Sequence, residues 1–91
     1  MAGNALVQQL ISDETRIYAL KSDGTIWACD AIPPLVWRQI KPFTGTGRPV
    51  SLSVAVVEPS FDPKALYTLS SDGTIWFFDY LNQTWNLENA P

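Results

Sequence analysis

The string SDGTIW occurs twice in this chain, as Ser22–Trp27 and again as Ser71–Trp76. The match extends outward to IYALKSDGTIWACD (Ile17–Asp30) against LYTLSSDGTIWFFD (Leu66–Asp79), so that each residue of the first stretch has a counterpart 49 positions later. Downstream, VWRQI is echoed by TWNLE, and upstream LVQQLI corresponds loosely to SLSVAVV. The chain of 91 residues is therefore predicted to be two copies of one unit.

Each copy is predicted to form four β-strands. Ser-Asp-Gly between two runs rich in Val, Ile, Thr, Tyr and Trp is a hairpin signal. Gly24 and Gly73 can adopt a positive φ without steric cost, and Asp23 and Asp72 can accept hydrogen bonds from the local backbone. The predicted strands are Leu6–Ile11, Arg16–Lys21, Thr25–Asp30, Leu35–Ile40, Ser51–Val57, Ala65–Ser70, Thr74–Asp79 and Thr84–Glu88.

The third strand of each copy carries apolar side chains on both of its faces. Because side chains alternate along a strand, Trp76 and Phe78 share one face while Ile75 and Phe77 share the other, and the first copy repeats this around Trp27. An antiparallel sheet with one wet face would alternate apolar with polar residues. We therefore expect sheets covered on both sides, as in a β-propeller, where each blade packs between two neighbours. The competing fold is a single eight-stranded sandwich or barrel.

The repeat divides the chain into two predicted blades and a linker. Residues 1–43 are the first blade, residues 44–49 the linker and residues 50–91 the second blade. The segment KPFTGTGRP around the linker is rich in Pro and Gly, which is typical of a connector. Small residues in SLSVAVV suit an innermost strand near a propeller axis, and the more polar VWRQI and TWNLE suit the outer edge.

The charge balance argues against several classes of partner. Six Lys and Arg stand against nine Asp and Glu, which gives a net charge of -3, so neither nucleic acid nor an anionic membrane surface is expected to bind. No apolar run approaches the roughly 20 residues of a membrane-spanning helix, so membrane insertion is not expected. The start MAGNALVQQL lacks the basic region of a signal peptide, which makes a cytoplasmic location the default expectation and leaves export without a cleaved signal open.

The residues that support common enzyme chemistry are missing. The chain has no His, and its single Cys29 excludes an internal disulfide and lies in an apolar strand, where an inert thiol is expected. Gly45–Arg48 (GTGR) lacks the Gly-Lys-Ser/Thr of a phosphate-binding loop. The carboxylates of Asp23 and Asp72 are explained by turns. We therefore predict that the protein is not an enzyme and has neither metal nor cofactor.

The stretch YALKSDGTIWACD resembles a blade of the β-propeller superfamily. Its order of aromatic residue, turn, glycine and strand is similar to tachylectin-like, tectonin-like, quinone-enzyme-like and chromosome-condensation-regulator-like repeats. It also resembles the Asp-box of sialidases, but Ser and Asp are adjacent here, so no sialidase chemistry is implied. Small two-repeat propeller lectins are similar in length and close their rings by association. The resemblance implies a homo-oligomer, and a homotrimer with six blades is favoured because two blades cannot close a ring.

Repetition, aromatic content and the lack of catalytic groups favour a lectin-like protein whose partner is a carbohydrate or glycoprotein surface. Several weak sites on one body bind such a surface more tightly than one site. An indole ring stacks on the C–H face of a sugar while polar neighbours bond to its hydroxyl groups. The candidate ligand-binding residues are Trp37, Trp85, Arg38, Asn86, Asp30 and Asp79. The residues assigned to the structural motif are Ser22, Asp23, Gly24, Trp27, Ser71, Asp72, Gly73 and Trp76.

Alternatives stay open for function and for the tryptophans. A protein-interaction scaffold would use loops such as Phe61–Pro63 and Lys41–Pro49, and a fragment of a longer propeller would have no activity of its own. Packing between blades is the expected role of the tryptophans within the repeated string. For Trp37 and Trp85, structural packing competes with sugar stacking.

Overall fold

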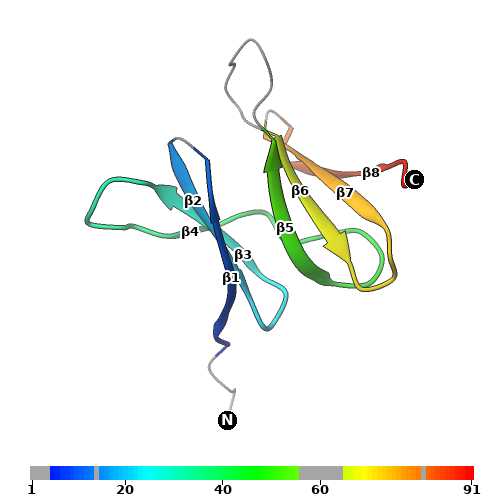
Figure 1. The fold of residues 1–91 in the computed structure, drawn as a ribbon, viewed down its shortest axis with the longest axis horizontal. Coiled ribbons are helices and arrows are strands. Elements are labelled where there is room, and N and C mark those ends of the chain that lie inside the picture. The colour runs from blue at the N-terminus through cyan, green and yellow to red at the C-terminus, as the bar shows by residue number, and fades with distance from the viewer. Residues whose placement is uncertain (1–4, 14, 56–64, 81) are drawn as a thin grey trace.

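The computed structural model describes residues 5–13, 15–55, 65–80 and 82–91. Within these ranges the chain forms no helix and two four-stranded antiparallel sheets, each with its strands in sequence order (Figure 1). The expectation of an all-β fold with four strands per repeat is confirmed. The first sheet contains β1 (Val7–Ser12), β2 (Arg16–Lys21), β3 (Ile26–Asp30) and β4 (Arg38–Gln39). The second contains β5 (Pro49–Ala55), β6 (Ala65–Ser70), β7 (Ile75–Asp79) and β8 (Thr84–Glu88).

Strand β4 is the main departure from the predicted boundaries. It covers Arg38–Gln39 in place of the predicted Leu35–Ile40. Pro33 and Pro34 have no N–H to donate to a ladder, and residues 30–36, which include them, are exposed, so the chain rejoins the sheet only at β4. Strands β3 and β7 each begin one residue later than predicted, because the threonine before them belongs to the turn.

The register of the first strands corrects the alignment of the two copies. Strands β1 and β5 have an irregularity at the same place, between Val7 and Gln9 and between Pro49 and Ser51. Leu10 pairs with Ala19 and Leu52 pairs with Thr68, so Leu10 and Leu52 are counterparts 42 positions apart. The predicted fifth strand, Ser51–Val57, is therefore shifted to Pro49–Ala55, and its last two predicted residues lie outside the described ranges.

The repeated string builds the same hydrogen-bonded turn in both copies. Asp72 Oδ1 accepts bonds from the N–H and the hydroxyl of Thr74, at 3.1 and 2.5 Å, and Trp76 Nε1 donates to Thr74 Oγ1 at 2.7 Å. Gly73 has a φ of 86°, in the region that favours glycine. The corresponding bonds of the first copy, 3.0, 2.6 and 2.9 Å long, join Asp23, Thr25 and Trp27. In each copy the aspartate thus fixes the threonine by hydrogen bonds, and the threonine hydroxyl fixes the indole ring of the tryptophan.

The serine of the string attaches the first strand of each sheet to this turn. Ser22 N donates to Leu6 O at 2.8 Å, and Ser22 Oγ accepts from Leu6 N at 3.1 Å. Ser71 makes the same two bonds with Arg48, at 2.8 and 3.0 Å. The serine, aspartate, glycine and tryptophan that were assigned to the motif therefore have defined contacts or geometry, and Thr25 and Thr74 join them.

One face of each sheet packs against the other sheet, and we call this contact the inner junction. Its buried core combines residues of both sheets: Tyr18, Leu20, Ile26, Ile40, Leu52, Leu66, Phe78 and Trp85. Gln9 crosses the junction, with Oε1 accepting from Leu52 N at 2.6 Å and Nε2 donating to Leu52 O at 3.2 Å. Among the described strands of the second sheet, β5 comes nearest to the first sheet and contacts β1 and β2 (Figure 1).

The connector between the sheets is fitted against the second sheet. The Phe43 ring meets Trp76 and Trp85 edge-on, with centroids 5.4 and 5.5 Å away, and Trp85 Nε1 donates to Lys41 O at 3.1 Å. A Cβ atom on Gly45 would lie 2.4 to 2.7 Å from the rings of Phe43 and Trp76. The connector is therefore a packed part of the fold.

We predict that Thr74→Val destabilises the protein by about 1–2 kcal/mol of unfolding free energy, because it removes the hydroxyl that joins Asp72 to Trp76 while keeping a similar shape. The measurement is urea denaturation followed by tryptophan fluorescence. The matched control is Thr44→Val at an exposed position, where a change within about 0.5 kcal/mol is expected. Equal losses in the two variants would contradict the structural role of this hydroxyl.

Candidate ligand-binding cleft

A cleft of about 670 Å³ opens between the two sheets. The first sheet contributes Arg16 from β2, Asp30 from the end of β3 and Arg38 from β4, and the second sheet contributes Tyr80 and Gln83 from the segment that follows β7. These side chains provide two cations, one carboxylate, a phenol and an amide, so the lining contains both donors and acceptors of hydrogen bonds.

The segment between β3 and β4 provides apolar lining to the same cleft. Ile32 and Val36 are 75% and 66% exposed, and both line the cavity together with Pro34. Phe78, on the second sheet, also lines the cleft and is itself buried in the core. The cleft therefore combines apolar surface with charged and hydrogen-bonding groups, which is the usual composition of a small-molecule site.

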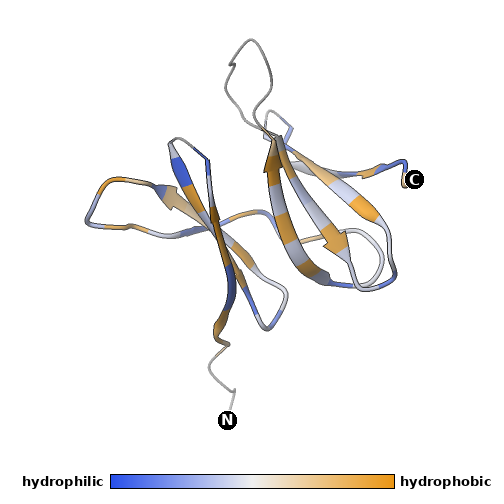
Figure 2. Cartoon of the chain, in the orientation of Figure 1, coloured by the Kyte–Doolittle hydropathy of each residue, from blue (hydrophilic) through white to orange (hydrophobic). Residues whose placement is uncertain are grey.

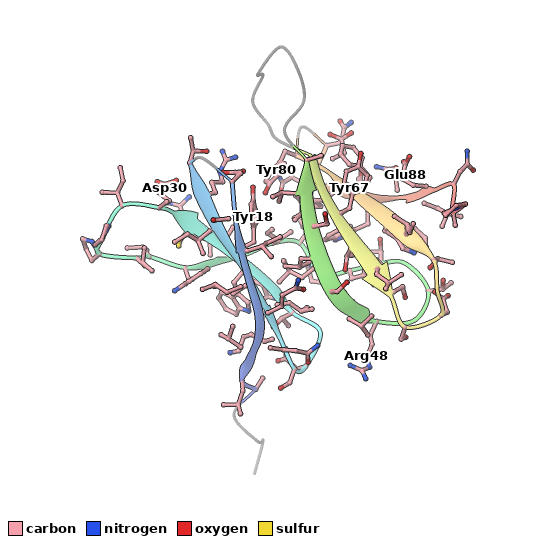
Figure 3. All side chains as sticks on the ribbon, viewed as in Figure 1. Tyr18, Asp30, Arg48, Tyr67, Tyr80 and Glu88 are labelled. Atoms are coloured by element: carbon pink, nitrogen blue, oxygen red, sulfur yellow. The ribbon has the colours of Figure 1, made fainter. Side chains whose placement is uncertain are left out.

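Tyr80 is held by a chain of hydrogen bonds that crosses the inner junction (Figure 3). Its hydroxyl donates to Tyr18 Oη at 2.9 Å, and the Tyr18 hydroxyl donates to Asp13 Oδ2 at 3.3 Å. Asp13 Oδ1 also accepts from the backbone N–H groups of Thr15 and Arg16, at 2.8 and 2.7 Å. The guanidinium carbon of Arg16 lies 5.3 Å from the centre of the Tyr80 ring, which is a cation–π contact.

The electrostatics of this network fix its protonation near neutral pH. Burial raises the pKa of Tyr80, and the hydrogen bond with Tyr18 raises it further. Burial also raises the pKa of Tyr18. Partial burial would raise the pKa of Asp13, but the hydrogen bonds from Thr15, Arg16 and Tyr18 together outweigh burial and lower this pKa. The two phenols therefore stay neutral while Asp13 stays ionised.

The cleft brings together two of the six predicted ligand-binding residues, Asp30 and Arg38, and both are exposed. Trp37 lies on the opposite face of the first sheet. There it is half-buried and borders a mainly apolar hollow of about 220 Å³, whose lining residues are Val7, Ala19, Lys21, Trp27 and Trp37. Lys21 Nζ lies 5.5 Å from the centre of the Trp27 ring in this hollow.

The other three predicted residues make contacts within the fold. Trp85 is 6% exposed, packed against Phe78 with ring centroids 4.9 Å apart, and bonded to the connector. Asp79 accepts from the backbone and side-chain nitrogens of Asn82, at 3.3 and 2.8 Å, and so closes the turn after β7. The Asn86 amide lies 3.3 Å from Thr84 Oγ1 on its own strand.

Sequence reasoning missed Arg16, Tyr80 and Gln83 as cleft residues. The signal that marks two of them is a difference between the copies, since Arg16 corresponds to Ala65 and Tyr80 corresponds to Ala31. The repeat pattern identifies the residues that the two copies share, and these residues build the turns and the core. The cleft uses residues that one copy has and the other lacks.

Neither metal chemistry nor similarity assigns a function. Among the described residues, no three His, Cys, Asp or Glu side chains are grouped closely enough to hold a metal ion. A search of the same residues found no helix long and apolar enough to cross a membrane. Comparison with protein-family models, curated proteins and solved structures yields no match. Function is therefore inferred from the cleft itself.

We predict that in Tyr80→Phe the free energy of unfolding falls less steeply as pH rises into the alkaline range. A raised pKa in the folded state means that the folded phenol keeps its proton where the unfolded phenol has lost it, near pH 10. The stabilising contribution is complete below about pH 10 and is lost as pH rises through the higher folded-state value. Urea denaturation at intervals between about pH 9 and about pH 11 measures this slope. For each protein, the free energy of unfolding at neutral pH is the reference. Identical slopes of this free energy against pH in Tyr80→Phe and in the parent protein would contradict the hydrogen-bonded network.

Proposed function

We propose that this protein is a non-enzymatic carbohydrate-binding protein, a lectin built from β-propeller blades. The observation that carries the proposal is the cleft between the sheets, where Arg16, Asp30, Arg38 and Tyr80 line the same cavity as an apolar loop. A sugar presents hydroxyl groups that both donate and accept hydrogen bonds, and C–H faces that pack on apolar surface. The lining of this cleft has donors and acceptors for the hydroxyl groups and apolar side chains for the C–H faces.

The lining residues take distinct roles in this proposal. Asp30 accepts hydrogen bonds from sugar hydroxyl groups, and Arg38 donates to sugar oxygens. The amide of Gln83 both donates and accepts. Ile32 and Val36, which are exposed, cover a C–H face of the ring. Tyr80 is oriented by Tyr18 and Arg16, so it enters the complex without a large loss of side-chain freedom.

Binding without catalysis fits the acidic residues of the cleft. Of the described residues that line it, Asp30 is the one carboxylate. Glycoside hydrolysis usually requires two carboxyl groups that face each other across the scissile bond. The sequence also contains no His that could act as a general base.

The proposal also identifies each sheet as a propeller blade and a ring of three chains as the assembly. Two features support it: the strands of each sheet follow one another in meander order, and the sheets come closest at β5 with β1 and β2. Propeller blades have the same strand order, and their first strands approach one another around a central channel. Three chains with two blades each would complete six blades, and equivalent clefts on one rigid body would add avidity.

The protein-interaction scaffold remains the second interpretation of the sequence. Of its two expected contact loops, Phe61–Pro63 lies outside the described residues. The other, Lys41–Pro49, packs on the second sheet through Phe43 and leaves no room for a side chain at Gly45. No contact of this connector favours a polypeptide partner over a sugar.

We predict that the purified protein binds a subset of glycans on an array and that Arg38→Ala weakens this binding by about tenfold or more, because a charged donor is lost. The repeat offers a matched control, since Asn86 is the counterpart of Arg38 and bonds within its own strand. Asn86→Ala is expected to change the affinity by less than about twofold.

Two results would overturn the proposal. An array blank for every glycan would remove the ligand class. Equal losses for Arg38→Ala and Asn86→Ala, in variants whose unfolding free energies match the parent protein, would show that the cleft is not where the glycan binds.

A further inference from the structure

The outer faces of the two sheets are counterparts of the two faces that meet at the inner junction, and we infer that a second copy of the chain packs head to tail against them. The junction joins the face of the first sheet that carries Tyr18 to the face of the second that carries Phe78. Through the repeat, Tyr18 corresponds to Tyr67 on the outer face of the second sheet, and Phe78 corresponds to Cys29 on the outer face of the first.

The outer face of the second sheet is apolar across two strands. Tyr67 pairs with Phe77 and Leu69 pairs with Ile75, so all four side chains lie on one face. The rings of Tyr67 and Phe77 are 5.5 Å apart. Leu69 is 42% exposed, whereas its counterpart Leu20 is fully buried at the inner junction. Figure 2 shows that apolar residues recur along β5, β6 and β7.

The outer face of the first sheet shows the same contrast with its counterpart. Leu10 is 60% exposed, whereas Leu52, its counterpart by register, is 5% exposed at the inner junction. Trp37 is half-buried, whereas its counterpart Trp85 is 6% exposed. Leu20, Leu52 and Trp85, which the junction buries, thus have apolar counterparts on the outer faces that are less covered, namely Leu69, Leu10 and Trp37.

The hollow beside Trp37 indicates what a second copy supplies. At the inner junction, Phe43 packs between Trp76 and Trp85, and Lys41 O accepts the indole N–H of Trp85. Trp27 and Trp37 border the corresponding hollow, and Trp37 Nε1 donates to no described residue. Through the repeat, the counterparts of Lys41 and Phe43 are Asn89 and Pro91 of the second copy. The Asn89 carbonyl would accept the Trp37 N–H, and the Pro91 ring would fill the hollow.

Such a contact joins two different faces, so it is heterologous, and it leaves one face of each kind free for the next copy. Repetition of the contact closes a ring when the rotation at each junction allows it. This inference rests on the propeller part of the proposal above and is independent of sugar binding.

The first test is the absolute mass in solution, by light scattering on a sizing column across a dilution series. The parent protein is expected at about 30 kDa, three times the 10.1 kDa of one chain. Leu69→Glu and Leu10→Glu each place a charge in the proposed contact, and each is expected to elute as a monomer. Leu87→Glu is the matched control, because Leu87 is 59% exposed but lies on the inner face of its sheet, so its mass is expected to match the parent.

Mixing the two disrupted variants tests the head-to-tail geometry. Leu69→Glu keeps an intact Leu10 face, and Leu10→Glu keeps an intact Leu69 face, so the mixture is expected to form a heterodimer of about 20 kDa joined by a single contact. A contact that paired identical faces could not be restored by mixing. Circular dichroism and urea denaturation establish that each variant is folded.

Three results would overturn the inference: a parent protein that is monomeric at the highest concentration that stays in solution, an assembly that both variants leave intact, or a mixture that stays monomeric. Each of them would also remove the ring from the proposed function, but none bears on sugar binding, because the cleft lies within one chain and monomeric variants would still bind glycan. Conversely, a 30 kDa particle that binds no glycan would overturn the lectin proposal alone.

Discussion

Each sheet of this protein carries apolar side chains on both faces, and among the described residues the two sheets cover one face of each other at the inner junction. The inner junction takes the Tyr18 face of the first sheet and the Phe78 face of the second and buries both. The path of the connector, the position of the cleft and the exposure of the outer faces are related to this contact. The connector packs against the second sheet before it reaches β5, and the cleft forms where Tyr18 and Tyr80 bridge the sheets. Leu10 and Leu69 stay exposed on the outer faces.

The repeated string orients one tryptophan in each copy by local hydrogen bonds. Aspartate accepts from threonine, threonine accepts from tryptophan, and these bonds orient the indole ring by contacts within five residues of the chain. In the second copy the oriented ring of Trp76 receives Phe43 from the connector. The fit is close enough that Gly45 has no space for a side chain. The turn motif and the packing of the connector are therefore parts of one arrangement.

The sequence predicts the parts of the structure that depend on neighbours along the chain. The alternation of side chains, the Ser-Asp-Gly turns and the repeat were enough to predict all eight strands. Six of the predicted strands agree with the structure within one residue at each end. The short β4 was harder, because its length depends on where the chain returns to β3 after two prolines. The two outer tryptophans show the limit most clearly. Trp37 and Trp85 occupy the same place in the repeat, yet one borders a hollow and the other is covered by Phe43, a difference set by the connector.

The cleft could not be predicted from repetition, because it depends on residues in which the copies differ. Arg16 and Arg38 have Ala65 and Asn86 as counterparts, so in the proposed ring the junctions between chains would lack both cations that line the junction within a chain. Asp79, the counterpart of Asp30, is already bonded to Asn82. Junctions of two kinds would therefore alternate around the ring, one kind with the charged cleft and one without it. A ligand that needs the charged cleft would bind once per chain and not once per blade. The shared residues of the repeat would then build the ring, and the residues that differ would set the number and chemistry of its sites.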